Sequence, residues 1–213
     1  MNFTFDNLKF LLPAVLIALT LHELAHGFVS YKLGDPTPKR EGRLSLNPFA
    51  HLDPFGTLCL IVFGFGWAKP VMVNPNYYKN PKVGMVLTAI AGPLTNFLIA
   101  FVCLLLDVLM IRFNLAYSNS FSFYIYNLLL VTSQISIGLG VFNLIPIPPL
   151  DGSKVLFALL PEDLYFKFMQ YERYISVALI FVLYLGVLDA PLMLIRNGIA
   201  NGLLNLVYPL VGF

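Results

Sequence analysis

The chain has 213 residues, of which 58% are hydrophobic and 11% are charged, and its formal net charge is +2. Soluble domains carry about 25% charged residues, so this composition excludes a soluble globular domain and indicates a multi-span membrane protein. The basic residues form no cluster suited to nucleic acid, and the two cysteines lie in apolar stretches without metal-ligand spacing. We therefore expect the lipid bilayer as a partner, no nucleic acid and no disulfide.

The first expected transmembrane helix covers residues 10–31 and contains the motif His22-Glu23-Leu24-Ala25-His26. About 20 apolar residues are enough to cross the hydrocarbon core of a bilayer. Residues i and i+4 lie on one face of a helix, so His22 and His26 can direct imidazole nitrogens at one metal ion. Glu23 lies beside the first histidine, where its carboxylate can take a proton from a water molecule.

Ionisable side chains inside an apolar span are costly in lipid, so this motif is a functional-site hypothesis. The ordinary alternative is a core histidine that bonds to a backbone carbonyl. Here two of the three histidines stand at the ligand spacing, with a glutamate in the required position. This coincidence favours a metal site, provided that a third ligand lies elsewhere in the chain.

Residues 32–83 differ from the rest of the chain, with seven Lys and Arg residues and many Pro, Gly and Asn. Within them, residues 55–67 are apolar but too short to span, which predicts a re-entrant or interfacial segment. We expect short β strands around residues 43–46 and 71–73. His51 lies in the same loop, where we expect it at the membrane interface as a supporting or substrate-side group.

Four further stretches are apolar enough to enter the membrane: residues 84–111, 121–144, 174–187 and 192–211. The first two predict a second and a third span, and the last two predict one or two more. Three prolines between residues 146 and 149 end the third span, and a short helix is expected to follow over residues 153–160.

We therefore expect an all-α polytopic membrane protein with about five transmembrane helices, or four as the alternative. A single membrane-embedded domain would cover residues 1–213, with a catalytic core of about residues 10–160 and accessory spans at about residues 170–211.

Charge predicts how these spans are oriented. Ten Lys and Arg residues lie in the 32–83 loop and after the third span, against three on the opposite side at Lys9, Arg112 and Arg196. By the positive-inside rule, the loop is cytoplasmic and the N-terminus is outside. We expect a multi-pass protein of the cell membrane with its active site toward the cytoplasmic side.

The third metal ligand should lie on the same side as the end of the first helix. Asp151 does so in the predicted topology, and a catalytic zinc commonly takes three protein ligands and leaves a fourth position for water. The alternative for Asp151 is a helix N-cap, because an apolar helix follows it. His51 is the next candidate.

The motif at residues 22–26, together with residues 143–152 (NLIPIPPLDG), resembles the site-2 protease family of intramembrane zinc metalloproteases. Residues 91–97 (AGPLTNF) and 66–71 (GWAKPV) also resemble motifs of that family. The resemblance covers about residues 10–160 and implies a catalytic core of three helices. We expect a minimal form, without a PDZ or nucleotide-binding regulatory domain.

The resemblance also implies roles for residues. Zn²⁺ would be held by His22, His26 and Asp151, and Glu23 would be the catalytic base. Members of the family cleave a transmembrane helix of a substrate protein, so single-span membrane proteins are the expected partners. The resemblance favours Asn143 for a role beside the metal as an oxyanion donor.

The same resemblance favours Asn96 for contact with the substrate. The alternative is that either asparagine satisfies backbone groups freed by Pro93 or Pro146.

Two other functions are open from the residues alone. The first is a membrane zinc protease of another type, whose third ligand would be Glu162 or Glu172, although neither lies in a metal motif. The second is a non-catalytic membrane protein that binds metal or retains substrate helices, which would not need Glu23 beside its ligands. The substrate and the oligomeric state do not follow from the sequence.

Overall fold

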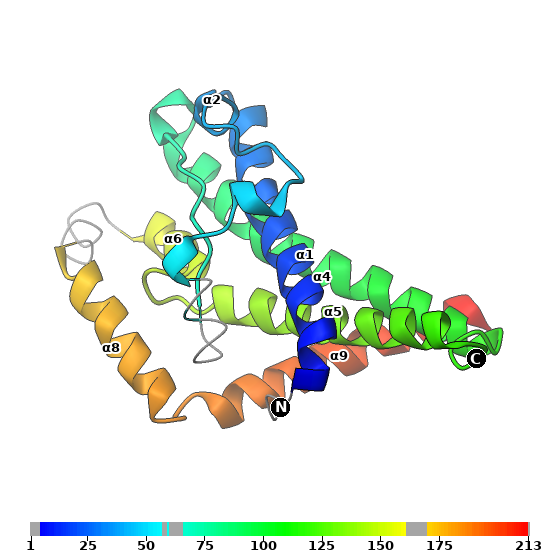
Figure 1. Ribbon diagram of the computed structural model, residues 1–213. Helices are drawn as coiled ribbons and strands as arrows, with labels where there is room; N and C mark the ends of the chain where they lie inside the picture. The colour runs from blue at the N-terminus through cyan, green and yellow to red at the C-terminus, as the bar shows by residue number, and fades with distance from the viewer. Residues whose placement is uncertain (1–4, 57–58, 60–65, 161–169, 213) are drawn as a thin grey trace.

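The computed structural model describes residues 5–56, 59, 66–160 and 170–212 (Figure 1). The described residues are predominantly helical, in line with the all-α prediction. The α helices, in chain order, are α1 (Phe5–Lys32), α2 (Thr37–Arg40), α4 (Pro81–Arg112), α5 (Ser120–Asn143), α6 (Asp151–Leu159), α8 (Glu172–Tyr184) and α9 (Asp189–Val211). Two 3-10 helices, η1 (Pro48–Ala50) and η2 (Pro75–Tyr77), lie in the loop between α2 and α4.

Three helices, α1, α4 and α5, are long and apolar enough to cross a membrane. The pair α8 and α9 adds a fourth crossing only if the two count as one span, because they are bent by 84° at the break between them. The structure thus supports three or four spans and does not confirm five. With 13 residues, α8 is about 20 Å long, which is too short to cross alone a hydrocarbon core of about 30 Å.

The short strands expected at residues 43–46 and 71–73 do not form. Among the described residues, β pairing is limited to one isolated bridge between Leu52 and Ala68. The buried Arg43 side chain instead donates to the carbonyls of Ala50 and Lys69. These bonds join two parts of the loop without a strand ladder. Most of the re-entrant segment expected at residues 55–67 lies outside the described residues.

Helices α4 and α5 begin where the sequence supplies a capping asparagine. The Asn80 side chain accepts a hydrogen bond from the Val83 N–H, and Pro81 occupies the first helical position, where no N–H is needed. The Asn119 side chain accepts from the Ser122 N–H in the same way. The helix ends therefore follow from local chemistry, and the apolar content between them sets their length.

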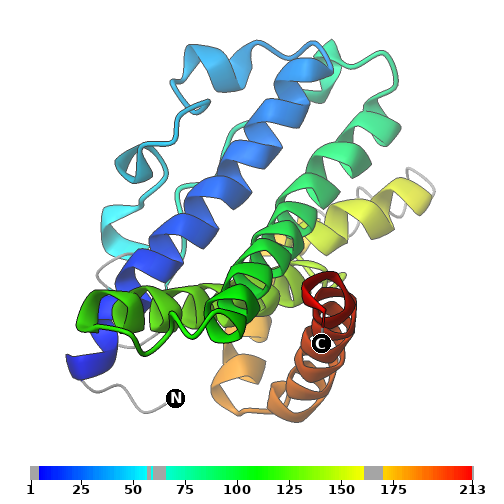
Figure 2. The ribbon, with the colours of Figure 1, turned by 90° about the vertical axis from the view of Figure 1, so that its right-hand side faces the viewer.

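Helices α1 and α4 run alongside each other, and α5 crosses both (Figures 1 and 2). Small residues let these helices approach closely. A Cβ at Gly140 of α5 would come within 2.7 Å of the Phe97 ring on α4. Helix α9 packs on the same unit, since Leu192 and Ile199 contact the buried cluster that contains Ile137.

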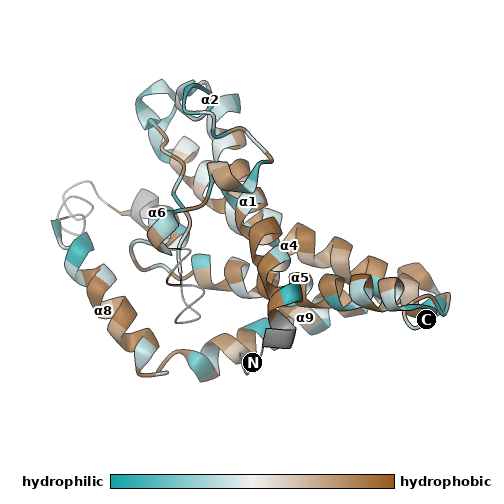
Figure 3. Ribbon diagram, in the orientation of Figure 1, coloured by the Kyte–Doolittle hydropathy of each residue, from teal (hydrophilic) through white to brown (hydrophobic). Residues whose placement is uncertain are grey.

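The outer surface of α4 carries a stripe of exposed large apolar side chains: Leu87, Leu94, Leu98, Val102 and Leu106. Such a stripe is unfavourable in water and favourable against lipid tails. Hydrophobic residues cover most of α1, α4 and α5, whereas hydrophilic residues gather around α2 (Figure 3). This pattern agrees with a membrane protein whose polar end is the α2 end.

Candidate metal centre

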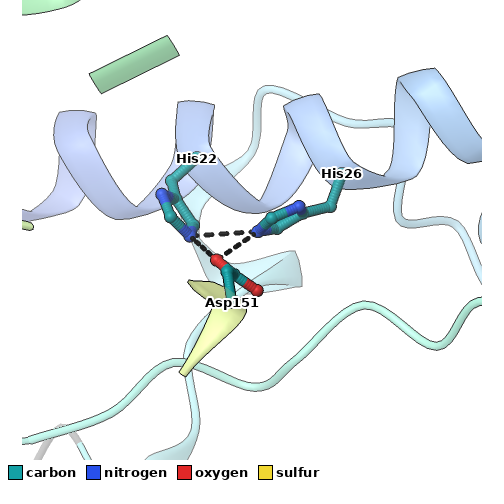
Figure 4. Close-up of side chains that lie close together, drawn as sticks. All are labelled: His22, His26 and Asp151. Atoms are coloured by element: carbon teal, nitrogen blue, oxygen red, sulfur yellow. Dashed lines mark hydrogen bonds and ion pairs between the residues drawn. The ribbon is translucent and has the colours of Figure 1, made fainter. Parts of the chain in front are cut away.

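Three buried side chains, His22, His26 and Asp151, meet between α1 and the start of α6 (Figure 4). The Oδ2 atom of Asp151 lies 3.1 Å from His22 Nε2 and 3.0 Å from His26 Nε2. The two Nε2 atoms are 3.0 Å apart. One turn of α1 separates the histidines and brings both rings onto one face, so their meeting is a local property of the helix.

Asp151 arrives from a distant part of the chain, 129 residues after His22. It is the first residue of α6, which folds back against the end of α5. Gly152 makes this return possible, because a Cβ there would come within 2.3 Å of the Leu144 carbonyl oxygen.

The contacts of a neutral His26 fit a cation between the three side chains. His26 Nδ1 lies 2.6 Å from the Thr88 carbonyl oxygen, which can only accept, so Nδ1 carries the proton. Neutral His26 then turns an unprotonated Nε2 toward His22 Nε2 and the carboxylate. Zinc bonds of about 2.0–2.2 Å place tetrahedral ligand atoms about 3.3 Å apart, so a small relaxation of this cluster would hold the ion.

His22 is held from behind by Asn96, whose amide nitrogen lies 3.1 Å from His22 Nδ1. A histidine that binds metal through Nε2 carries its proton on Nδ1 and needs an acceptor there. Asn96 Oδ1 has no hydrogen-bond partner among the described residues. With the amide rotated by half a turn, this oxygen would accept from the His22 Nδ1–H. The Asn96 side chain is fully buried, so this geometry favours support of His22 over contact with substrate.

Two further groups around the cluster were not predicted from the sequence. Lys154 Nζ donates to Asp151 Oδ1 at 3.1 Å, which leaves Oδ2 facing the histidines. The sequence could have predicted this contact, because Lys154 lies three residues after Asp151 and residues at that spacing are neighbours on a helix. The Thr88 carbonyl has no such signal, because a backbone acceptor can belong to any residue type.

Gly92 on α4 leaves the space that the two imidazoles occupy. A Cβ at this position would lie 2.4 Å from His26 Nε2 and 2.6 Å from His22 Cε1. The motif at residues 91–97 therefore serves the site in two ways. Gly92 leaves space for the imidazoles, and Asn96 supplies its amide.

Glu23 lines the same cavity as the three candidate ligands, a space of about 130 Å³. Its Oε2 atom accepts a hydrogen bond of 3.0 Å from the Val71 N–H. The Pro70–Val71 segment thus closes one wall of the cavity and orients the carboxylate. The resemblance at residues 66–71 marked this segment as a motif of the family, but it did not predict the hydrogen bond between the Val71 N–H and Glu23.

The other predicted site residues lie at different distances from the cluster. Asn143 lines the cavity, and its amide donates to the Leu139 carbonyl at 3.0 Å. His51 is buried in the loop, where its Nε2 bonds to the Ser45 carbonyl at 2.8 Å, and it does not line the cavity. Glu162 lies outside the described residues, and Glu172 begins α8 without joining the cluster.

A helix that carries His-Glu-x-x-His, with a distant carboxylate completing the ligand set, defines a centre of the metallopeptidase class. The profile of peptidase family M50 matches residues 107–183, which include Asn143 and Asp151. "Putative zinc metalloprotease YwhC" of Bacillus subtilis is 41% identical over 181 residues, which are 84% of this chain and 83% of that protein.

Two proteins of Methanocaldococcus jannaschii are also similar. "Zinc metalloprotease MJ0392" is 32% identical over 182 residues, 84% of this chain and 43% of that protein. "Putative zinc metalloprotease MJ0611" is 33% identical over 160 residues, 71% of this chain and 72% of that protein. No solved structure gives a significant match. The chain belongs to peptidase family M50, the site-2 protease family, and the predicted class of enzyme, a zinc metalloprotease, is confirmed.

Proposed function

We propose that this protein is an intramembrane endopeptidase that cleaves the transmembrane segment of single-span membrane proteins, with Glu23 as its catalytic base. The observation that carries the proposal is the convergence of His22, His26 and Asp151 with Glu23 on one cavity. His22 lies ten residues before Lys32, about 15 Å along a helix that is apolar enough to span. The chemistry would therefore take place at membrane depth.

His22, His26 and Asp151 would hold Zn²⁺, which supplies a lowered pKa for a bound water and polarisation of the substrate carbonyl. Glu23 accepts the proton of the attacking water and passes it to the leaving amine. The Val71 N–H keeps the carboxylate directed into the cavity.

The remaining polar groups support this reaction. Asn143 donates to the oxyanion that develops on the substrate carbonyl, after exchanging its bond to the Leu139 carbonyl. Asn96 and the Thr88 carbonyl fix the two imidazoles, and Lys154 fixes the carboxylate. His51 has a structural role in the loop. A substrate helix must unwind locally, because its carbonyls are otherwise bonded within the helix.

The decisive experiment uses the purified protein in lipid vesicles with a set of single-span peptides. Cleavage is followed by mass spectrometry, with and without a zinc chelator, for the parent protein and for Glu23→Gln. We expect chelator-sensitive cleavage within the apolar segment, and none by Glu23→Gln although its zinc content is unchanged. Cleavage by Glu23→Gln at the parent rate would refute Glu23 as the base.

We also propose that the protein is a multi-pass protein of the cell membrane whose active site faces the cytoplasm. The excess of Lys and Arg residues in the 32–83 loop supports this orientation. Single cysteines at Thr37 and Ser118, on a cysteine-free background, stand before and after α4, which is about 48 Å long. They should react with an impermeant reagent from opposite faces, and reaction from one face would contradict the topology.

One membrane-embedded domain over residues 1–213 fits the packing. The catalytic core of residues 10–160 contains α1, α4, α5 and α6, and residues 170–211 add α8 and α9. Because α9 packs on α4 and α5 through Leu192, Ile199 and Leu203, we assign it to the same unit as an accessory element.

A further inference from the structure

A second cavity, of about 580 Å³, lies between α1, α5, α8 and α9. Its walls are mainly apolar and include Val15, Leu19, Ile135, Leu139, Phe142 and Trp67. Leu19 precedes His22 by about one turn of α1, and Phe142 directly precedes Asn143, which lines the metal cavity. The two cavities therefore follow each other along the same faces of α1 and α5.

Two charged groups, Asp189 and Arg196, line this mainly apolar cavity. On α9, residues Asp189, Leu192, Met193 and Arg196 line the cavity together, at the spacing of a single helical face. A Cβ at Gly138 of α5 would lie 3.5 Å from Arg196 Nε and 3.6 Å from Cζ. The guanidinium therefore lies over a position of α5 that has no side chain.

Arg196 has no hydrogen bond or ion pair with any residue that the structure describes. Asp189 is about 10.5 Å away along α9, and its charge is accounted for by the N-terminus of that helix. The positive-inside rule counts Arg196 with the charges of the outer side, but it lines a cavity together with Leu19 from the middle of the α1 span. A charged side chain at membrane depth is costly unless it has a partner or a function. Arg196 therefore lacks a structural explanation, and it lines the cavity that adjoins the metal cavity along α1 and α5.

We propose that this cavity receives the transmembrane segment of the substrate beside the cleavage site, and that Arg196 pairs with a carboxylate side chain of that segment. The proposal rests on the proposed intramembrane cleavage and names the class of substrate. A guanidinium binds a carboxylate through two parallel hydrogen bonds, and such a pair is strong where water is excluded. Apolar walls with one exposed guanidinium fit an apolar helix that carries one acidic residue.

The position of Arg196 predicts where that acidic residue stands. Gly138 is five residues from Asn143, or about 7.5 Å along α5. This distance equals about two extended residues or five helical residues of the substrate. The carboxylate should therefore lie two to five residues from the scissile bond, on the side that enters the second cavity.

The depth of the cavity favours a substrate side chain over a lipid phosphate as the partner. Leu19, which lines the cavity, is about 20 Å along α1 from Lys32 and about 16 Å from Leu8, the two ends of the span. The cavity thus lies near the middle of a hydrocarbon core about 30 Å thick. Headgroup phosphates lie at its two surfaces.

The test uses the full protein with matched single-span peptides, in vesicles of phosphatidylcholine alone and in vesicles that also contain phosphatidylglycerol. One peptide carries Glu at a position two to five residues from the cleaved bond, and others carry Gln or Lys there. The parent protein should cleave the Glu peptide about tenfold or more faster, in kcat/KM, than the Gln peptide. Arg196→Gln should abolish this preference, and Arg196→Glu should prefer the Lys peptide.

Arg173→Gln on α8 is the matched control, since Arg173 does not line the cavity, and it should retain the preference for the Glu peptide. Reversal of preference in Arg196→Glu cannot arise from misfolding, so it separates pairing from a loss of structure. Capture of the Glu peptide by Glu23→Gln, measured by fluorescence, should weaken about tenfold when Arg196→Gln is added.

Each other outcome has a distinct meaning. If the parent protein cleaves the Glu, Gln and Lys peptides at equal rates, this inference is wrong and the proposed function stands. If it cleaves no peptide at any lipid composition, the proposed function fails, and this inference fails with it. If Arg196→Gln lowers all rates equally, and only in vesicles that contain phosphatidylglycerol, Arg196 binds a lipid phosphate and the pairing is refuted.

Discussion

Gly92→Ala should separate the stability of the protein from its metal affinity. A glycine inside a helix is ordinarily less favourable than alanine by about 0.5–1 kcal/mol, so the substitution should favour α4. At Gly92, however, the new Cβ would lie 2.4 Å from His26 Nε2 and 2.6 Å from His22 Cε1. We therefore expect a lower affinity for zinc, while in the melting temperature the gain in helix stability and the clash with the imidazoles oppose each other.

The size of the effect follows from how the imidazoles are held. An ordinary Cβ contact is at least 3.4 Å, so the rings must retreat by about 1 Å. His26 is tied to the Thr88 carbonyl and His22 to the Asn96 amide, so the rings cannot retreat without losing these bonds. Loss of such supporting bonds lowers metal affinity by about 10- to 100-fold. A misplacement of about 1 Å costs about 100-fold in rate.

The assay compares zinc content at buffered free zinc, melting temperature and cleavage rate for the parent protein and Gly92→Ala. Gly198→Ala is the matched control, because a Cβ at Gly198 of α9 meets no atom of the described residues within 4 Å. It should preserve zinc affinity and cleavage. If Gly92→Ala binds zinc with the parent affinity, the imidazoles do not depend on the space at Gly92, and the proposed arrangement of the centre is wrong.

Three further predictions follow from the contacts of the site and the loop. Asp151→Ala should lower zinc occupancy as strongly as His26→Ala, because Asp151 and His26 each supply one of the three converging ligand atoms. If metal analysis of Asp151→Ala shows full occupancy, Asp151 is no ligand and serves only as the first residue of α6. Asn143→Ala should keep its fold and zinc but cleave about tenfold or more slowly, and cleavage at the parent rate would make Asn143 structural. Burial alone would raise the pKa of Asp35, but hydrogen bonds from Thr37, the Asn74 N–H and Ser30 hold it below its ordinary value of 3.8. The stabilisation by Asp35 is therefore present above pH 3.8 and lost as the pH falls through the lower, folded-state pKa. The melting temperature of the parent protein should fall more steeply below pH 3.8 than that of Asp35→Asn, and parallel pH profiles would contradict this anchoring role.

The sequence determined the parts of this protein that depend on neighbouring residues. The first three spans, expected at residues 10–31, 84–111 and 121–144, appear as α1, α4 and α5 with ends displaced by a few residues. Lipid requires every backbone group of a span to be bonded within the helix, so apolar length alone predicts these helices. The His22 and His26 pair follows from the same local geometry.

Local patterns were less informative in the loop and near the C-terminus. Residues 43–46 alternate polar and apolar side chains as strands do, and residues 71–73 are all apolar, but the Arg43 and Glu23 side chains bond to the loop backbone in place of a strand partner. The stretches at residues 174–187 and 192–211 are apolar, yet their number of crossings depends on the 84° bend between α8 and α9. Hydropathy carries no information about that angle.

Only the tertiary structure decided which distant groups meet. It brought Asp151 to the histidines, placed the Asn96 amide behind His22, and aimed the Val71 N–H at Glu23. It also laid Arg196 over Gly138, although 58 residues separate them in the chain. These contacts join helices through small residues and backbone atoms, whose identity does not reveal their partner. Their positions follow from how closely α1, α4, α5 and α9 pack, which is a property of all the side chains between them.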